Sequence, residues 1–387
     1  MSIQFLPSLL ISFLLLSFTH AFEGDMYDFF LPNGLKVILM EKHAAPRVAV
    51  GVYYNVGSHD DPDGQKGITK IVKYMMLEGT SKFPKSDEKL MRELKSHIWD
   101  SVNKDRTYFS IEVPKEKIDF ALDLESDRMQ NVIISDSLLE KTKLKLKTRE
   151  DTWRNKNAID VGFTELILES MPEGHPYKTM DWGIKEQVDT LSLDACQNYY
   201  RTYFAPNNAV LVVVGDFNPE KATTLIYQYF NHLVPSESIP SDPDLSLKIN
   251  SKKIYKKNIE FSQQPMYFSF SLLSFNLPSA RNDDVIILEH IADILIRDSQ
   301  RPGDIYKSYS KNRRLMLGAN LWINTSLGHS NFSIGGMNIF RDGPTKKIKK
   351  SILDTFEDIG ENGIDEKLLE NQRKHNLLES YEDGYNY

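Results

Sequence analysis

Cysteine is almost absent from this sequence, in which Cys196 is the only one among 387 residues. A single thiol cannot form a disulfide within the chain, so the fold must be held together by its hydrophobic core. The stretch around it, DACQNYY, contains nothing that suggests a nucleophile. We therefore interpret Cys196 as a buried structural residue.

An excess of positive charge is also lacking. The 47 Lys and Arg residues are outnumbered by 54 Asp and Glu residues, which gives a net charge of −7. Nucleic-acid-binding proteins carry a basic patch or stripe, so nucleic acid is not an expected partner. The Lys-rich stretch KTKLKLKTR at 141–149 alternates with apolar residues, a pattern that indicates a solvated helix face.

Long apolar runs are scarce as well, and the clearest is FLPSLLISFLLLSF at 5–18. It is shorter than the roughly 20 residues that a membrane span needs. The small residues Thr19 and Ala21 follow it, so we predict a signal peptide over 1–21 and a periplasmic or secreted protein with no stable membrane span after cleavage. No Lys or Arg precedes the run. The alternative is therefore an uncleaved anchor or a lipid-facing helix.

The rest of the chain has the composition of a folded protein, with 41% hydrophobic residues and a length that allows two domains. Asn33-Gly34 between two alternating runs predicts a β-hairpin, because both turn residues must accept positive φ. Further strands are predicted by alternating or continuous apolar runs at 47–56, 106–114 and 208–217. Helices are predicted at 67–77, at 86–99 and over the long stretch 118–154.

A segment rich in Pro, Ser and Asp follows these elements and reads as a linker. We place the boundaries at 22–232 for an N-terminal domain, 233–255 for the linker and 256–387 for a C-terminal domain. Strands predicted at 265–275 and within 317–337 repeat the strand-then-helix order of the first part. The predicted fold class is thus α+β, with two related halves that each pack helices on an antiparallel-rich sheet.

Zinc-protease motifs of the H-x-x-E-H or H-E-x-x-H type are absent, and the nine His residues are scattered. The predicted helix GITKIVKYMML nevertheless places Lys70, Lys73 and Tyr74 on one face, because positions i, i+3 and i+4 project together. Two histidines and a glutamate occupy these same offsets in the inverted zinc motif. Any helix offers this spacing, so the flanking sequence must decide its meaning.

The flanking stretches resemble the pitrilysin/insulinase family of zinc peptidases, which includes the mitochondrial processing peptidase and its bacterial relatives. The resemblance is carried by LPNGLKVILMEKHAAPRVAVGVYYNVGSHDDPDGQKGI, MMLEGTSKFP, DRTYFSIEVPKEKIDFALDLESDRMQN and YRTYFAPNNAVLVVVGDFNPEKA. It covers about residues 25–230 well and 260–375 loosely. The resemblance implies the family's fold more strongly than its activity.

The resemblance also assigns positions in the family's zinc site. The first His of the family falls on Lys70, the Glu that acts as general base on Lys73, and the second His on Tyr74. The third ligand, a Glu further along the chain, falls on Glu150 in REDTWRNKN. Only one of these four functional positions therefore keeps the family's residue type.

Two further family features fall on altered residues. The Asn-Ala motif of the strand that holds substrate backbone falls on Trp99-Asp100. Members that lack the zinc motif carry an Arg and a Tyr that assist a partner's site, and these positions fall near Ser310 and on Leu317. The chain thus lacks both the catalytic and the helper residues of the family. It also ends before a further helix and strand expected of the second half, which we expect to be incomplete.

The chemistry of the substituted residues disfavours zinc. An ammonium group has no lone pair to donate to a metal unless it is deprotonated. At ~4 Å and an effective dielectric of ~20, each ammonium repels a unit positive charge by about 4 kcal/mol and a dication by about twice that. We therefore expect no cofactor. We hypothesise that Lys70 or Lys73 forms an ion pair with Glu150; the alternative is a polar helix face turned to solvent.

These observations predict a non-catalytic member of the family. Its expected role is that of a subunit or scaffold that pairs with an active zinc peptidase, or with a second copy of itself, and helps to enclose a peptide. Two alternatives stay open: an active zinc metalloendopeptidase with an atypical ligand set and bound zinc, and a degenerate remnant of such an enzyme.

Overall fold

The computed structural model describes residues 26–84, 98–171, 173–241, 269–277, 316–324 and 330–338, with further single positions between 92 and 96, at 282 and between 354 and 374. The predicted signal peptide, most of the predicted helix 86–99 and the position near Ser310 lie outside these residues.

Two compact units are present, Met1–Lys147 with Asp181–Asp242, and Thr148–Met180 with Pro243–Tyr387. The boundary at 242/243 falls within the predicted linker. The segment 148–180, predicted to be part of the N-terminal domain, groups with the second unit.

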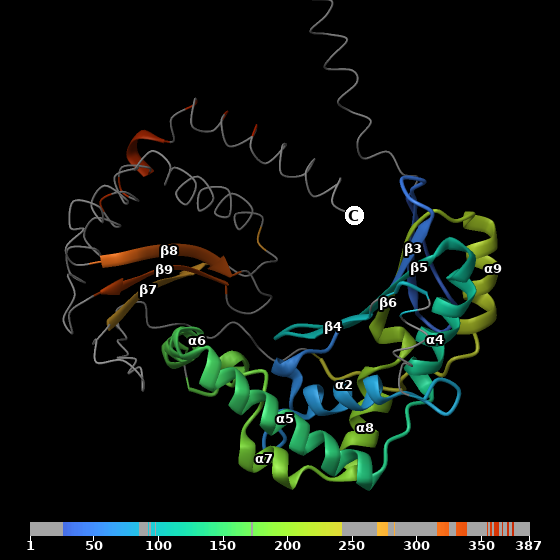
Figure 1. The fold of residues 1–387 in the computed structure, drawn as a ribbon, viewed down its shortest axis with the longest axis horizontal. Coiled ribbons are helices and arrows are strands. Elements are labelled where there is room, and N and C mark those ends of the chain that lie inside the picture. The colour runs from blue at the N-terminus through green and yellow to red at the C-terminus, as the bar shows by residue number, and fades with distance from the viewer. Residues whose placement is uncertain are drawn as a thin grey trace, which may run out of the picture. The chain divides into compact units, whose positions relative to one another are not determined.

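A six-stranded mixed sheet forms the centre of the first unit (Figure 1). Its strands follow the order β1-β2-β6-β3-β5-β4. Neighbouring strands are antiparallel except for β2 and β6, which run parallel. The strand bounds are β1 Met26–Phe30, β2 Lys36–Glu41, β3 Arg47–Tyr54, β4 Ile98–Val102, β5 Thr107–Pro114 and β6 Ala209–Gly215.

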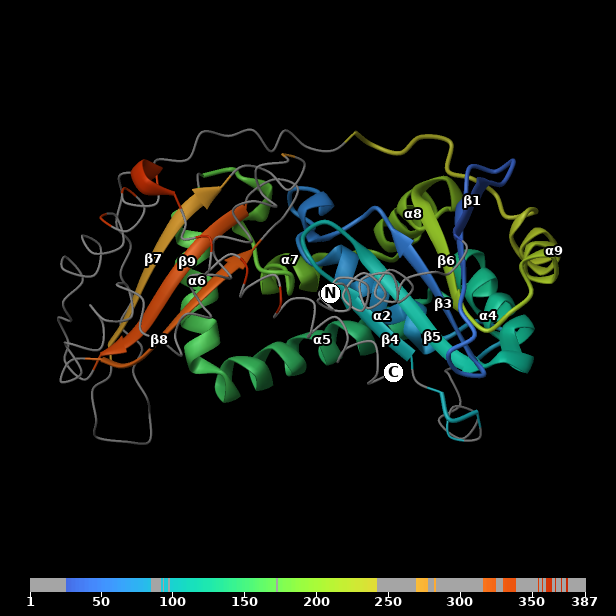
Figure 2. The ribbon, with the colours of Figure 1, turned by 90° about the horizontal axis from the view of Figure 1, so that it is seen from above.

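One face of this sheet is buried along its inner strands β3, β5 and β6, and the other face is partly open. In β3, Val48, Val50 and Val52 are 0% exposed, and burial alternates in the same way along β5 and β6. Successive side chains of a strand point to opposite faces, so these residues share the face that the helices cover. Each fully buried valine contributes about 1.5–3 kcal/mol to stability. Helices α2, α4, α8 and α9 lie on this side, as Figure 2 shows.

Two helices of the first unit, α8 and α9, begin at a residue whose side chain caps the first turn. Ser192 Oγ accepts a hydrogen bond from Ala195 N–H at the start of α8, and Asn218 caps α9 through Lys221 N–H. The helix bounds are α2 Ile68–Glu78, α4 Ile118–Gln130, α5 Asp136–Lys156, α6 Ala158–Ser170, α7 Lys185–Thr190, α8 Leu193–Tyr203 and α9 Pro219–Phe230. None of the helices described is long and apolar enough to cross a membrane.

The second unit contains a three-stranded antiparallel sheet of order β7-β9-β8. Its strands are β7 Ser269–Leu277, β8 Met316–Asn324 and β9 Ser330–Asn338. Helix α6 belongs to the same unit and contacts β7. Antiparallel-rich sheets packed with helices thus occur in both units, and the predicted fold class is confirmed.

Three local predictions need correction. At the hairpin, Gly34 has φ of 88° but Asn33 does not have positive φ, because Asn33 Oδ1 instead accepts a hydrogen bond from Leu35 N–H in a wider turn. The helix predicted up to Trp99 ends earlier, since Ile98 and Trp99 already pair with β5. The long helix predicted over 118–154 is divided into α4 and α5 by a break at 131–135.

Candidate functional site

Helix α2 is the predicted metal helix, and a buried carboxylate fixes its first turn. Asp61 Oδ2 accepts a hydrogen bond from Gly67 N–H at 2.6 Å, and Oδ1 accepts one from Thr69 N–H at 3.1 Å. Gly67 precedes the helix with φ of 107°, a conformation that favours glycine. Burial raises the pKa of Asp61 to about 6, although the hydrogen bonds from Thr69 and Gly67 oppose this shift.

Lys70 lies half-buried on α2 and contacts an aromatic ring. Its Nζ is 4.0 Å from the centroid of the Trp182 ring, a cation–π geometry. Asp181 lies next to Trp182, and burial raises its pKa, but the charge of Lys104, the Ser58 hydroxyl and the more distant charge of Lys70 lower it overall. The Lys70 ammonium therefore lies in a negative and aromatic environment.

Lys73 is buried, with 4% of its surface exposed, and its Nζ forms an ion pair with Asp100 Oδ2 on β4. The ammonium also lies 4.4 Å from the centroid of the Tyr74 ring. Tyr74 is 3% exposed, and Lys145 of α5 lies 5.2 Å from the same ring. The alternative of a polar helix face turned to solvent is thus wrong for Lys73 and Tyr74.

Glu150 lies on α5 in the second unit, and Arg154 compensates its charge there. The Glu150 side chain is 6% exposed, and its Oε1 accepts a hydrogen bond from Arg154 Nε at 2.7 Å. Arg154 Nη1 is 2.8 Å from Glu165 Oε1 on α6, so one guanidinium bridges two carboxylates. The hypothesis that Lys70 or Lys73 pairs with Glu150 joins residues of different units and stays a prediction. Both Lys73 and Glu150 have an ion-pair partner within their own unit.

These residues do not fit a zinc ion. Structural and catalytic zinc sites use imidazole, thiolate or carboxylate ligands. Positions 70 and 73 present ammonium groups, and Asp100 is the carboxylate that Lys73 engages. Among the residues that the structure describes, no group of three or more His, Cys, Asp or Glu side chains is arranged to hold a metal ion. The side chains of Lys70 and Lys73 therefore form an ion pair and cation–π contacts in place of metal ligation.

Strand β4 carries the two positions assigned to the substrate strand. It forms one edge of the six-stranded sheet and pairs with β5. Asp100 points to the helix-covered side, where it meets Lys73, while Trp99 points to the opposite face and is 43% exposed. The ion pair therefore connects the edge strand to α2.

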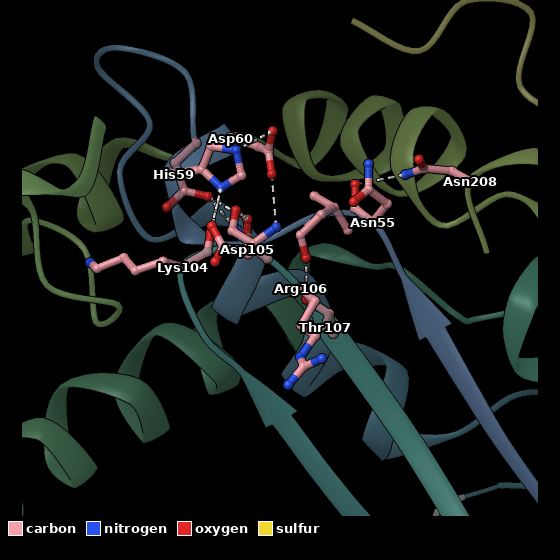
Figure 3. A network of polar contacts seen from close by, with 12 residues as sticks. Asn55, His59, Asp60, Lys104, Asp105, Arg106, Thr107 and Asn208 are labelled. Carbon is pink, nitrogen blue, oxygen red and sulfur yellow. Dashed lines mark hydrogen bonds and ion pairs between the residues drawn. The ribbon is translucent and has the colours of Figure 1, made fainter. Parts of the chain in front are cut away.

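Two tight turns that the sequence did not single out hold β4 and α2 together (Figure 3). His59 Nδ1 donates a hydrogen bond to the carbonyl of Lys104, and His59 N–H donates to the same carbonyl at 3.1 Å. Asp60 Oδ2 accepts from Gly57 N–H at 2.8 Å, and Lys104 Nζ pairs with Asp181 at 2.9 Å. These contacts join the approach to α2 with the β4–β5 turn. The Gly-Ser-His-Asp-Asp run before α2 is the sequence signal that could have indicated them.

Two family models match this chain. The model described as "Insulinase (Peptidase family M16)" matches residues 36–170, and the one described as "Peptidase M16 inactive domain" matches residues 190–376. A Helicobacter pylori protein named zinc protease PqqE is 21% identical over 68% of this chain. The match spans 60% of that relative's length.

Solved structures show the same fold. A protease from Helicobacter pylori has a TM-score of 0.79 at 17% identity, covering 94% of this chain and 86% of the other. A peptidase M16 inactive domain from Pseudomonas fluorescens has a TM-score of 0.75 at 17% identity, covering 91% and 83%. The periplasmic protease PqqL from Escherichia coli has a TM-score of 0.67 at 13% identity, covering 92% of this chain but 40% of that protein.

Proposed function

Because this chain belongs to the insulinase family of peptidases, peptidase family M16, we propose that it is a non-catalytic member that binds extended peptides beside an active zinc peptidase. The observation that carries the proposal is the ion pair that the buried Lys73 forms with the partly exposed Asp100. Lys73 holds the position of the family's general base, and a protonated ammonium engaged with a carboxylate cannot accept a proton from water.

Peptide binding does not require the metal. An edge strand presents unpaired N–H and C=O groups, and an extended peptide can add to it as a further strand. Among the described strands, β4 is the last at one edge of the sheet, and the Lys73–Asp100 ion pair and the β4–β5 turn hold it against the body of the first unit. We therefore place peptide binding at β4 and assign the cleavage of bound peptides to a catalytic partner.

The partner is proposed to be an M16 peptidase with intact H-x-x-E-H, or else a second copy of this chain. Support comes from the match of 190–376 to the M16 inactive domain. A periplasmic or secreted location is proposed from the apolar run at 5–18. The likeness in fold to PqqL from Escherichia coli, a periplasmic protease, agrees with this location.

Expression of the full chain with and without an active M16 peptidase from the same host tests this proposal. We expect no cleavage of an unfolded peptide by the chain alone, and we expect the peptidase to co-purify with it and cleave the peptide. Chelator-sensitive cleavage by the chain alone would contradict the non-catalytic role. A chain that stays monomeric when isolated from its own host would contradict the subunit role.

A further inference from the structure

We propose that β4 selects peptides with a bulky apolar or aromatic side chain, and that Trp99 determines this preference, with Tyr108 and Tyr53 continuing the aromatic row behind it. The inference rests on the proposed function, because it supposes that a peptide adds to the edge of β4. It goes further by identifying which side chains of the sheet contact the peptide and which peptide side chains they favour.

The strand register places the three rings on one face of the sheet. Trp99 lies opposite Ser110, two residues from Tyr108 on β5, so Trp99 and Tyr108 are diagonal neighbours. Tyr108 lies opposite Tyr53 on β3, and their rings stack with centroids 5.3 Å apart and planes 25° apart. The rings therefore form an aromatic row across β4, β5 and β3.

This aromatic row lies on the face opposite the helices. Phe109 and Ile111, which alternate with Tyr108 and Ser110 along β5, are 0% exposed, whereas Tyr108 is partly exposed. Trp99, at the edge, is 43% exposed. A strand added beside β4 directs every second side chain to this face, so those side chains meet Trp99 first.

Two ion pairs lie beside the aromatic row. Lys73 is paired with Asp100 on the helix side of β4, and Arg47 is paired with Glu112 on the same face as the row. Cross-strand pairs between an aromatic residue and another aromatic or β-branched residue stabilise a sheet, so the row favours such residues in the added strand.

A binding assay with the full-length chain tests the proposal. The probes are a fluorescently labelled peptide of alternating Thr and Phe and a matched peptide of alternating Thr and Ser, both with the same solubilising tail. Fluorescence anisotropy gives the Kd of each. We expect the Phe peptide to bind more tightly, by up to about fivefold for each cross-strand pair gained.

Three variants locate the source of this preference. Trp99→Ser should bind both peptides with similar Kd, whereas Trp99→Phe should keep the preference. Tyr227→Ser is the matched control, because Tyr227 is an aromatic residue that is 44% exposed and stacks on Phe29 at the other edge of the sheet. It should keep the preference unchanged.

The outcomes separate this inference from the proposed function. A Trp99→Ser variant that still prefers the Phe peptide would overturn the role of the aromatic row, while the binding itself would still support the proposed function. No binding of either peptide would overturn both. Trp99-dependent association of the chain with itself that neither peptide inhibits would show that β4 takes a second copy, and would also overturn the inference.

Discussion

Lys73 carries a positive charge to an interior position, and the Asp100 carboxylate compensates it. Glu150 is compensated in the same way by Arg154 within the second unit. At both positions, which the family resemblance assigns to zinc chemistry, a neighbouring side chain of opposite charge is present. Loss of one partner of a buried pair leaves an uncompensated charge, whereas exposed pairs matter little. The ion pair at Lys73 therefore makes a specific prediction about stability.

Substitution Lys73→Met is expected to lower the free energy of unfolding by about 3 kcal/mol, because it leaves Asp100 without its buried partner. Urea unfolding of the full chain measures the change. Lys82→Met is the matched control, since Lys82 pairs with Asp123 at 54% side-chain exposure and its loss should cost less than about 1 kcal/mol. Equal effects of the two substitutions would show that Lys73 is not a buried ion-pair partner.

Asp61 predicts a dependence of stability on pH. Its pKa in the folded protein, about 6, lies above the usual 3.8, so the folded state holds the proton more tightly. This contribution to stability is complete below about pH 4 and is lost as the pH rises through about 6. A difference of about 2 pKa units corresponds to roughly 3 kcal/mol.

The Asp61→Asn variant isolates this effect, because Asn does not titrate in this range and the loss of one of the two acceptor oxygens lowers stability equally at each pH. Between about pH 4 and pH 6, the stability of the variant relative to the natural chain should rise. Urea unfolding of both proteins across that range measures the difference. Parallel pH profiles would indicate that Asp61 has an ordinary pKa in the folded protein.

Helix α4 shows how an element is anchored to the sheet by more than apolar contacts. Glu125 is fully buried, with its Oε1 3.5 Å from Arg128 Nη2. The Arg128 guanidinium lies 4.7 Å from the ring centroid of Phe109 on β5. Burial raises the pKa of Glu125, and the charge of Arg128 opposes this. The two charges are thus coupled beneath α4.

Removal of one of these two charges is therefore expected to destabilise the protein more than removal of both. Glu125→Leu or Arg128→Leu should each lower the free energy of unfolding by about 3–5 kcal/mol, and the double variant should be close to neutral or more stable. Urea unfolding of the three variants completes a double-mutant cycle. Additive losses would mean that the two charges do not interact.

Strands were more readily predicted than helix boundaries. The apolar run at 47–56 identified β3, and the near-continuous apolar run at 208–217 identified β6, which lies between β2 and β3 inside the sheet. The break between α4 and α5 was missed, since NVIIS at 131–135 contains neither Gly nor Pro. The start of β4 at Ile98 was missed because its pairing with β5 depends on residues distant in sequence.

At the site, the sequence identified the positions but not their partners. The i, i+3, i+4 spacing correctly placed Lys70, Lys73 and Tyr74 on α2. Lys70 contacts Trp182 and Lys73 pairs with Asp100. Both partners lie in segments that only the tertiary fold brings to the helix. Arg154 could have been found, because it lies four residues after Glu150, a spacing at which opposite charges on a helix meet.

For the whole molecule, the fold and the family are established more firmly than the activity. Family models cover 36–170 and 190–376, and the proteins from Helicobacter pylori, Pseudomonas fluorescens and Escherichia coli share the fold at 17% identity or less. At the positions that the family resemblance assigns to a zinc ligand and to the general base, Lys70 and Lys73 differ from the family's residues in charge as well as in identity. The proposed non-catalytic role rests on this departure.

The zinc content of the purified full-length chain after dialysis against excess zinc tests this distinction most directly. We predict far less than one zinc ion per chain, because Lys70 stands at a ligand position and Lys73 at the position of the general base, and both bring positive charge to the site. One tightly bound zinc ion per chain, with cleavage of an unfolded peptide that a chelator abolishes, would contradict the non-catalytic role.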